Sequence, residues 1–396
     1  MKLAEHRGFQ RLSLAHPALG KLPPSTPGAA AQKYFALAVH QHDADVRAKS
    51  IWVDHVIHLS VSLPYVRLRR HMPHTTPFLW RRLGVLLVLA AAISVASLIA
   101  GGSGIGIRDA LGGLFGGADQ TARAVMMEVR LPRLLAGFGV GSLLALAGVL
   151  LQALFRNPLA DPFVLGVSGG AAVGALLATI LGATVIAVQS AAAAGALMAV
   201  AVVYLLARGG GTPRLLLTGA VFASACGALV MVLLAITDST RVRGMVFWLA
   251  GDLEWATSPW ASLLAALVAL AFAFSVARPL NVLAAGEVRA HSVGLHVEGW
   301  RTAVFAACAV LTAIAVVNAG TVGFVGLITP HAVRSAFRTS DHRLVAPASA
   351  LLGGTLLAGA DLLARTVASP RQLPVGAVMA LVGTPLFIAL LRGRKA

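Results

Sequence analysis

Arginines, a polar turn and glycines surround one apolar run in the first half of the chain. Arg130-Leu-Pro-Arg133 precedes the run, and Arg156-Asn-Pro-Leu-Ala-Asp-Pro162 and the Gly-rich segment Leu165-Gly-Val-Ser-Gly-Gly170 follow it. The chemistry that such residues offer is ionic, because a planar guanidinium group pairs bidentately with carboxylates. The order of charge, apolar run, turn and small-residue helix predicts a membrane hairpin with basic residues at its mouth. This pattern is typical of a transporter and not of a soluble enzyme.

Residues that could perform covalent chemistry are scarce in the apolar part of the chain. We find no convergent Ser/His or His/Asp/Glu set there, and the last four histidines lie near expected loops. Cys226 and Cys308 each lie inside an apolar run without a neighbouring ligand residue, which favours two inert buried thiols over a disulfide or a metal site. The G-x-x-x-x-G-K-S/T phosphate loop is also missing from the sequence. The sequence therefore predicts no catalytic residue, no metal site and no cofactor bound by this chain.

Composition indicates a membrane protein. Hydrophobic residues make up 58% of the chain, only 12% of residues are charged, and the mean hydropathy is +0.82. Many apolar runs approach the roughly 20 residues that span a bilayer. The net charge of +17 could indicate nucleic-acid binding, but the Lys and Arg residues lie at the ends of apolar runs instead of along one face. We therefore expect a polytopic membrane protein that contacts membrane lipid and has no nucleic-acid partner.

Ten apolar runs predict ten membrane spans. The long run from 163 to 207 must turn near Gly182-Ala-Thr184, and the stretch from Thr302 to Val333 is short for two full crossings at about 1.5 Å per residue. Asn318 and three glycines after it would let the helix break, so we expect a short or re-entrant element there. The expected spans are residues 79–101, 133–155, 163–182, 184–207, 214–237, 259–277, 302–318, 320–336, 344–364 and 373–391.

Charge and weak internal similarity predict the orientation of the spans. From residue 79 onward, the expected inner loops and ends carry fourteen Lys and Arg residues and the outer loops carry eight, so both ends of this region are expected inside. Ala147-Gly148 precedes Pro158 by the same interval as Ala319-Gly320 precedes Pro330. Copies that begin five spans apart have opposite orientations, an inverted-repeat arrangement that places a pathway at the interface between the repeats.

Residues 1–78 differ from the rest of the chain. They contain eight of the twelve histidines but no span-length apolar run and no signal peptide. Three explanations stay open: a metal-binding tail, which the histidine spacings do not favour, a largely disordered cytoplasmic extension, and a true initiation site at Met72. We favour the third, because Arg81-Arg82 then directly precedes the first span. The expected division is an N-terminal extension, residues 1–78, and a transmembrane domain, residues 79–396.

Eight short strings of the chain, in this order, resemble the FecCD family of ABC importer permeases. The resemblance covers about residues 79–393, and each string alone is weakly specific. The strings are Arg130-Leu-Pro-Arg133, Arg156-Asn-Pro-Leu-Ala-Asp-Pro162, Phe247-Trp-Leu-Ala-Gly251, Arg278-Pro-Leu-Asn281, Gly286-Glu287 with Gly294, Gly323-Phe-Val-Gly-Leu-Ile-Thr-Pro-His331, Asp341-His-Arg343 and Leu373-Pro-Val-Gly376.

The resemblance implies an all-α, polytopic inner-membrane permease of about ten transmembrane helices with inverted-repeat-like halves. Members carry iron-siderophores, haem or cobalamin, and family frequency makes ferric siderophore the expected substrate, with haem and cobalamin behind it. The implied partners are a separate ATPase subunit that uses ATP and Mg, a periplasmic binding protein or lipoprotein, and a second permease copy in a homodimer or a heterodimer. An ion-coupled secondary transporter is the rival from another class, although the spans are almost free of ionisable residues.

The resemblance assigns Arg130, Arg133 and Arg365 to docking of the binding protein at the outer face. In the family, matching arginines hold acidic residues on the two lobes of that protein, and we expect exposed guanidinium groups here. The alternatives are contact with lipid phosphates and local pairing, such as Asp361 with Arg365 at positions i and i+4 of one helix. The amphipathic, aromatic segment 243–252 is expected near the same outer mouth.

Two inner turns match the loops that close the cytoplasmic end of the pathway in the family. They are Asn157-Pro158-Leu159 and the turn at Thr212-Pro213, so Asn157, Leu159 and Thr212 are the expected cytoplasmic gate. Both turns could instead be simple connectors between spans. Pro213 stands where relatives can have a second small hydroxyl residue, which departs from the family pattern.

The inner loop from Leu280 to Arg301 resembles the coupling helices that rest on the ATPase subunit in the family. It contains a helix-forming stretch from Leu283 to His291. The expected coupling residues are Gly286, Glu287, Arg289 and Gly294. An amphipathic helix at the membrane interface is the alternative interpretation.

Overall fold

The computed structural model describes residues 76–101, 108–109, 112–113, 120–209, 211–256 and 258–392. Within these ranges, the side chains of residues 76, 77, 212, 255, 287 and 391 are not described. The expectations for residues 1–75, including the extension and the initiation site at Met72, lie outside the described residues. The fold that follows is that of the transmembrane domain.

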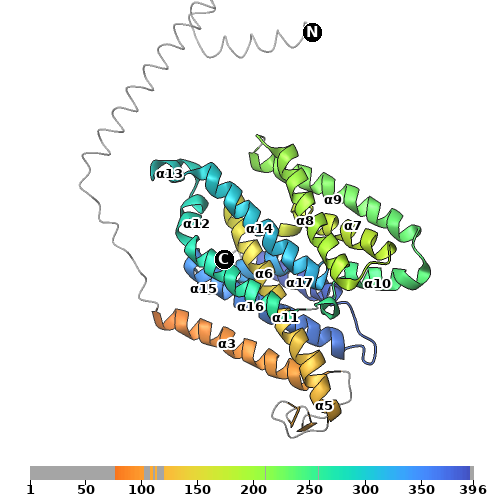
Figure 1. The fold of residues 1–396 in the computed structure, drawn as a ribbon. Coiled ribbons are helices and arrows are strands. Elements are labelled where there is room, and N and C mark those ends of the chain that lie inside the picture. Colours follow the sequence, from red (N-terminus) through yellow and green to blue (C-terminus); the bar gives the residue numbers. More distant parts are fainter. Residues whose placement is uncertain are drawn as a thin grey trace, which may run out of the picture. The chain divides into compact units, whose positions relative to one another are not determined.

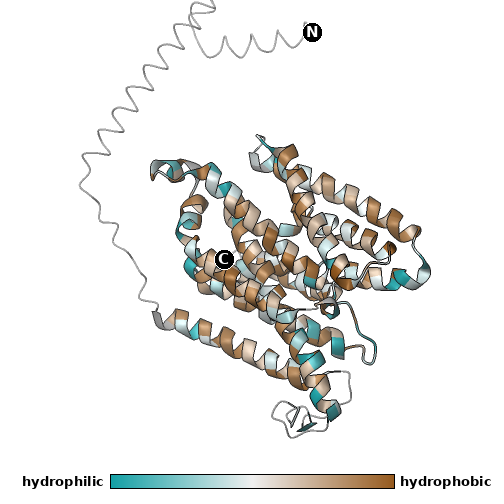
Figure 2. Cartoon of the chain, viewed as in Figure 1, coloured by the Kyte–Doolittle hydropathy of each residue, from teal (hydrophilic) through white to brown (hydrophobic). Residues whose placement is uncertain are grey.

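Helices occupy all ten expected spans, and α7 and α8 separate at the turn predicted near Gly182. Figure 1 shows the arrangement of the helices, and Figure 2 shows that apolar residues dominate them. In chain order these ten helices are α3 (Thr76–Ile99), α6 (Leu131–Phe155), α7 (Val167–Ile180), α8 (Val185–Ala207), α9 (Gly211–Ala235), α11 (Pro259–Ser275), α14 (Val297–Ala319), α15 (Val325–Phe337), α16 (His342–Thr366) and α17 (Val375–Arg392).

Helix length separates full crossings from short elements. Six helical segments of the described chain are long and apolar enough to cross a membrane alone, and α11 with α12 (Ala277–Ala284), bent by 59°, makes a seventh. α7 and α15 are the third spans of the two groups of five and have only 14 and 13 residues, about 20 Å at 1.5 Å per residue. These matching short helices agree with inverted-repeat-like halves. The expected all-α polytopic membrane fold is confirmed.

α6 is the central helix of the bundle. It packs against α11, α14, α15 and α16. Its glycines permit close backbone contact: a Cβ on Gly141 would lie 2.3 Å from the Gly353 carbonyl oxygen, and a Cβ on Gly148 would lie 1.9 Å from the Gly326 carbonyl oxygen. Helix association in a membrane depends on such packing of small residues, because lipid removes the hydrophobic driving force between helices.

Polar contacts join segments that were expected on the same side of the membrane. On the outer side, α10 (Ser239–Leu249) is the expected amphipathic helix. Arg241 Nη1 in this helix donates to the carbonyl oxygens of Thr179 and Ile180 at 3.0 and 2.9 Å. On the inner side, the hydroxyl oxygens of Tyr204 and Thr302 lie 3.2 Å apart. The contacts therefore agree with the expected grouping of these segments at two ends of the bundle, and the orientation of the ends stays a prediction.

The expected break between spans seven and eight follows α14. Gly320 comes directly after this helix with a φ of 64°. A Cβ on Gly320 would lie 2.0 Å from the Trp248 carbonyl oxygen, so this position requires glycine. The short element predicted here is confirmed, because α15 begins only at Val325.

The helix of the second span begins earlier than expected. It starts as α5 (Gln120–Ala124) and continues through the π-helix η1 (Val125–Arg130) into α6. Pro132 has no N–H for the helical ladder, and the wider π turn directly before it accommodates the missing bond. Arg133 is therefore enclosed in a continuous helix instead of lying at the point where the chain emerges.

The expected helix from Leu283 to His291 is wrong. Two short helices, α12 and α13 (Glu287–Ser292), occupy the loop. Gly286 between them has a φ of 116°, which residues with a Cβ rarely adopt. The chain therefore changes direction at this glycine.

Replacement of Gly148 with alanine is expected to destabilise the bundle, because the added methyl group meets the Gly326 carbonyl oxygen where α6 crosses α15. Overpacking of this kind costs about 1–3 kcal/mol of unfolding free energy. Thermal unfolding of the detergent-solubilised protein, followed by size-exclusion chromatography, measures the loss. Gly227→Ala is the matched control, since a Cβ there has no neighbour within 4 Å. Equal melting temperatures for the two variants would contradict the crossing.

Candidate functional site

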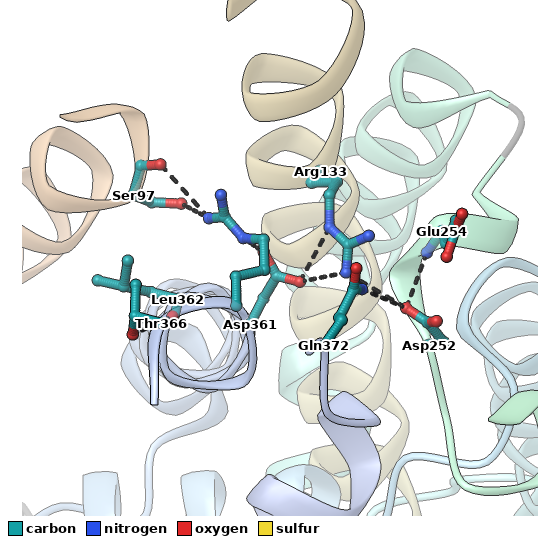
Figure 3. Close-up of polar contacts among 9 residues, drawn as sticks. Ser97, Arg133, Asp252, Glu254, Asp361, Leu362, Thr366 and Gln372 are labelled. Atoms are coloured by element: carbon teal, nitrogen blue, oxygen red, sulfur yellow. Dashed lines mark hydrogen bonds and ion pairs between the residues drawn. The ribbon is translucent and has the colours of Figure 1, made fainter. Parts of the chain in front are cut away.

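Polar side chains from five segments meet at the outer end of the bundle, as Figure 3 shows. The segments are α3, α6, the loop that enters the 3-10 helix η3 (Leu253–Trp255), α16 and the connection into α17. We call these residues the outer cluster: Ser97, Arg133, Asp252, Asp361, Arg365 and Gln372. Most of them are far apart in the sequence, so only the tertiary structure assembles them.

Asp361 is shared by two arginines. Its Oδ1 accepts hydrogen bonds from Arg133 Nη2 at 2.8 Å and Nε at 3.2 Å, and its Oδ2 accepts one from Arg365 Nε at 2.8 Å. Arg365 Nη2 also donates to Ser97 Oγ at 2.8 Å. Hydrogen bonds between ionised partners are stronger than neutral ones, and Asp361 is 0% exposed. This carboxylate therefore holds both guanidinium groups.

Asp252 and Gln372 complete the surroundings of Arg133. Asp252 Oδ1 lies 3.2 Å from Arg133 Nη2 and accepts a hydrogen bond from Glu254 N at 3.1 Å. Burial raises the pKa of Asp252 above its ordinary value, although the Glu254 N–H and Arg133 oppose the rise. With its amide oxygen turned toward Arg133, Gln372 accepts hydrogen bonds from Nη1 at 2.9 Å and Nη2 at 2.6 Å. Two carboxylates thus balance the two guanidinium groups of the cluster.

Arg130 caps a helix beside the outer cluster. Its Nη1 donates to the carbonyl oxygens of Leu98 and Ile99 at 2.8 Å each. These oxygens belong to the last turn of α3, where carbonyl groups have no partner within the helix. The helix dipole also favours a cation at this end.

The expected exposure of the three docking arginines is wrong. Arg130, Arg133 and Arg365 are only 1%, 8% and 9% exposed. Carboxylate, hydroxyl and carbonyl oxygens of the same chain accept hydrogen bonds from all three residues, and the alternative pairing of Asp361 with Arg365 is confirmed. Their role in docking stays a prediction.

Two of the expected gate residues lie in one turn after α6. Asn157 Oδ1 accepts a hydrogen bond from Leu159 N at 2.9 Å, as in an Asx turn. Leu159 is 51% exposed. Thr212 lies in the first turn of α9, and its side chain is outside the description, so the role of these three residues as a gate stays a prediction.

Gln152 joins α6 to α15 close to this turn. Its Nε2 donates to the carbonyl oxygens of Gly326 and Leu327 at 3.2 and 3.3 Å, and its Oε1 accepts a hydrogen bond from Arg334. Neither Gln152 nor Arg334 was predicted from the sequence as a site residue. A long amide side chain inside an apolar run is the signal that could have found the first, since a buried polar group needs partners.

The expected coupling residues lie on and around α13 at the inner end. Gly286 and Gly294 flank this helix with φ values of 116° and 76°. Arg289 is exposed. Glu287 is the first residue of α13, and its side chain is outside the description.

α12, α13 and the start of α14 form a small core of their own. Leu283, Ala290 and Val297 are buried together, separately from the main core. Val288 on α13 and Val293 directly after it are 87% and 62% exposed. The coupling segment, residues 277–294, therefore presents two apolar side chains to its surroundings at α13, while α12 is anchored in the main core by Leu280.

Ser97, Asp252 and Gln372 were not predicted as partners of the arginines. The available signal was charge balance: Asp361 is one of very few ionisable residues within the spans, and an intramembrane carboxylate requires a nearby cation. The i, i+4 spacing identifies Arg365 as one partner, but nothing in the sequence identifies Arg133 as the other.

A bundle of apolar helices with polar clusters at both ends is the architecture of a transmembrane transport protein. Within the described ranges, no group of three His, Cys, Asp or Glu side chains could hold a metal ion. The chain belongs to the FecCD transport family, whose model matches residues 87–393.

Named relatives are cobalamin permeases. The chain is 45% identical over 287 residues to the cobalamin import system permease protein BtuC of Halobacterium salinarum, covering 70% of this chain and 76% of that protein. It is 39% identical over 277 residues to the vitamin B12 import system permease protein BtuC of Klebsiella pneumoniae, covering 67% of this chain and 83% of the relative.

Solved structures share the fold. An inward-facing structure described as a metal-chelate type ABC transporter is 31% identical with a TM-score of 0.69, covering 79% of this chain and 99% of the other. PsaBC from Streptococcus pneumoniae in complex with Fab is 16% identical with a TM-score of 0.52, covering 68% and 93%, and supports the fold alone.

This protein is therefore the permease subunit of an ABC importer and a multi-pass protein of the inner membrane. It is a transport subunit and not an enzyme. In ABC importers a separate ATPase subunit uses ATP and Mg, so this chain needs no cofactor of its own.

The Asp361→Asn variant is expected to lose about 3–5 kcal/mol of unfolding free energy, because it leaves buried guanidinium groups without their shared carboxylate. Thermal unfolding in detergent measures the change. Asp238→Asn is the matched control on the same side, since Asp238 is exposed and its side chain caps no helix. Unfolding of Asp361→Asn at the temperature of the control would show that the cluster contributes little. Gln372→Ala tests the same cluster more gently if Asp361→Asn does not fold.

Proposed function

We propose that this permease imports cobalamin. The observation that carries the proposal is the 45% identity with the cobalamin permease of Halobacterium salinarum, and the similarity to the Klebsiella pneumoniae permease adds to it. Ferric siderophore, the substrate expected first from the sequence, is the second candidate, because the solved relative with 31% identity is described as a metal-chelate type transporter. Cobalamin is itself a metal chelate, so the two similarities are compatible.

The proposed assembly contains two copies of this chain, two ATPase subunits below them and one binding protein above. Substrate passes from the binding protein into a pathway between the permease copies. Exposed apolar faces support a second copy: α3 and α9 bury only 17% of their apolar windows within the chain. Such faces need either lipid or another helix against them.

We propose that the binding protein docks over Arg130, Arg133 and Arg365. Burial of the three residues means that acidic side chains would add to existing pairs instead of meeting free cations. Arg365 supports this arrangement, because its Nη1 makes no hydrogen bond among the described residues while Nε and Nη2 are occupied. A guanidinium group has donors enough for two carboxylates.

We also propose that Asn157, Leu159 and Thr212 close the inner end and that Gly286, Glu287, Arg289 and Gly294 contact the ATPase. The two sites are neighbours: a Cβ on Gly286 would lie 3.8 Å from Arg156 Nη1, in the turn that holds Asn157. Movement of the coupling segment would therefore reach the gate directly.

Uptake into proteoliposomes tests the function. The permease, reconstituted with its ATPase and binding protein, is expected to accumulate radiolabelled cyanocobalamin in the presence of ATP and not with a non-hydrolysable analogue. Ferric siderophore and haem are measured in parallel. Accumulation of siderophore without cyanocobalamin would replace the proposed substrate, and uptake that collapses with the ion gradient but ignores ATP would indicate a secondary transporter.

The Val288→Asp variant is expected to weaken ATPase binding about tenfold or more, because burial of a valine side chain contributes about 1.5–3 kcal/mol and a carboxylate resists burial. Affinity of the purified permease for the ATPase, measured by biolayer interferometry, gives the change. Val367→Asp is the matched control, since Val367 is 71% exposed and lies on the outer side. Equal affinities for both variants would argue against contact at α13.

A further inference from the structure

Asn281 on α12 is hydrogen-bonded to the first residues of α16. Its Nδ2 donates to Asp341 Oδ1 at 2.7 Å. Its Oδ1 accepts a hydrogen bond from His342 N at 3.0 Å and lies 2.6 Å from His342 Nδ1. One amide group therefore connects the coupling segment with two consecutive residues of another helix.

We call the hydrogen bonds among Asn281, Asp341 and His342 the polar joint. Its donors and acceptors determine which atom of Asn281 faces each partner. The backbone N–H of His342 can only donate, so the atom that faces it is the amide oxygen of Asn281. The His342 Nδ1 beside the same oxygen must then carry a proton and donate as well. Asn281 thus uses its amide nitrogen for Asp341 and its oxygen for His342, an arrangement that no other uncharged side chain of similar length supplies.

Asp341 also begins α16. Its Oδ1 accepts a hydrogen bond from Arg343 N at 3.0 Å, which caps the helix. Partial burial alone would raise the pKa of Asp341, but the Arg343 N–H and the Asn281 amide outweigh burial and hold the pKa below its ordinary value. The carboxylate is therefore ionised when it meets Asn281.

Asn281 lies at the boundary between two cores. Leu280 before it belongs to the main core, and Leu283 after it belongs to the small core of the coupling segment. α13 therefore connects with the body of the protein at two places, through α12 at the position of Asn281 and through Val297 at the start of α14. The polar joint gives this boundary a fixed geometry that a few apolar contacts would not supply.

α16 connects the joint with the outer cluster. The helix has 25 residues and is about 37 Å long at 1.5 Å per residue. The first turn of α16 is hydrogen-bonded to Asn281 of α12. The last turns of α16 contain Asp361, which contacts α6, and Arg365, which contacts α3. α16 is one continuous helix over this length, although it contains Pro347, and it is therefore the element that connects its first turn with the outer cluster.

We propose that Asn281 is a positioning residue that transmits movement of the coupling segment to α16 and through it to the outer cluster. The proposal rests on the proposed function of residues 286–294 as the ATPase contact. Loss of the polar joint lowers the amount of substrate transported per ATP hydrolysed, while the subunits stay assembled.

The test measures uptake of radiolabelled cyanocobalamin and ATP hydrolysis in the same proteoliposomes, with the complete transporter. Asn281→Ala is expected to lower the uptake per ATP hydrolysed on the order of fivefold, the lower range of measured coupling between sites. Asn281→Asp is expected to act alike, because its carboxylate opposes Asp341. Asn318→Ala is the matched control, since the Asn318 amide bonds only within its own helix.

A compensating double substitution gives the decisive variant. Asn281→Asp combined with Asp341→Ser places one hydroxyl group that can donate to the new carboxylate and accept from Arg343 N, keeps the two donors of His342 satisfied and retains a serine cap on α16. This double variant is expected to recover most of the uptake per ATP. A purely structural role would instead lower the melting temperature and the ATPase content of the purified complex, both of which are measured for each variant.

The outcomes separate the two proposals. Wild-type ratios for Asn281→Ala, or a double variant no better than Asn281→Asp, would overturn the role of Asn281. Absence of cyanocobalamin uptake by the wild type would overturn the proposed substrate. In that case the role of Asn281 is tested by the stimulation of ATP hydrolysis that the binding protein causes. This stimulation does not depend on the substrate chosen. A wild-type complex without this response would overturn both.

Discussion

The pairing of a buried carboxylate with two arginines is the interaction on which the outer half of the structure depends. A charged side chain in the middle of a bilayer costs about 2.5–3.5 kcal/mol on insertion scales. Asp361 accepts hydrogen bonds from Arg133 on α6 and from Arg365 on its own helix, and Arg365 continues to Ser97 on α3. Because each of these charges needs the others, the ends of three helices and the loop at Asp252 have one stable arrangement.

Between its two ends, the bundle is held together by the packing of small residues and not by charge pairs. α6 carries small residues that let the backbones of α15 and α16 approach it, and this packing replaces the hydrophobic effect as the source of helix association. At the inner end polar joints return, with Gln152 between α6 and α15 and Asn281 between α12 and α16.

Much of the fold could be predicted from the sequence, because its signals are local. Apolar runs of bilayer length indicate helices whatever surrounds them, and all ten expected spans coincide with helices. The turn near Gly182 and the break at Gly320 were predictable because glycine adopts positive φ values without strain. Gly286 carried the same signal. Two alanines before it and a charged pair after it favoured a continuous helix, so the helix break at Gly286 was missed.

The sequence by itself determined the helices, their order and the family of the chain. Only the tertiary structure decided which charges meet. Arg133 and Asp361 are 228 residues apart, and no local pattern links them. The sequence therefore suggested exposed cations where the fold buries paired ones. Burial of a guanidinium group depends on carboxylates that the chain brings to it from a distance, and this is a property of helix packing that charge counts cannot express.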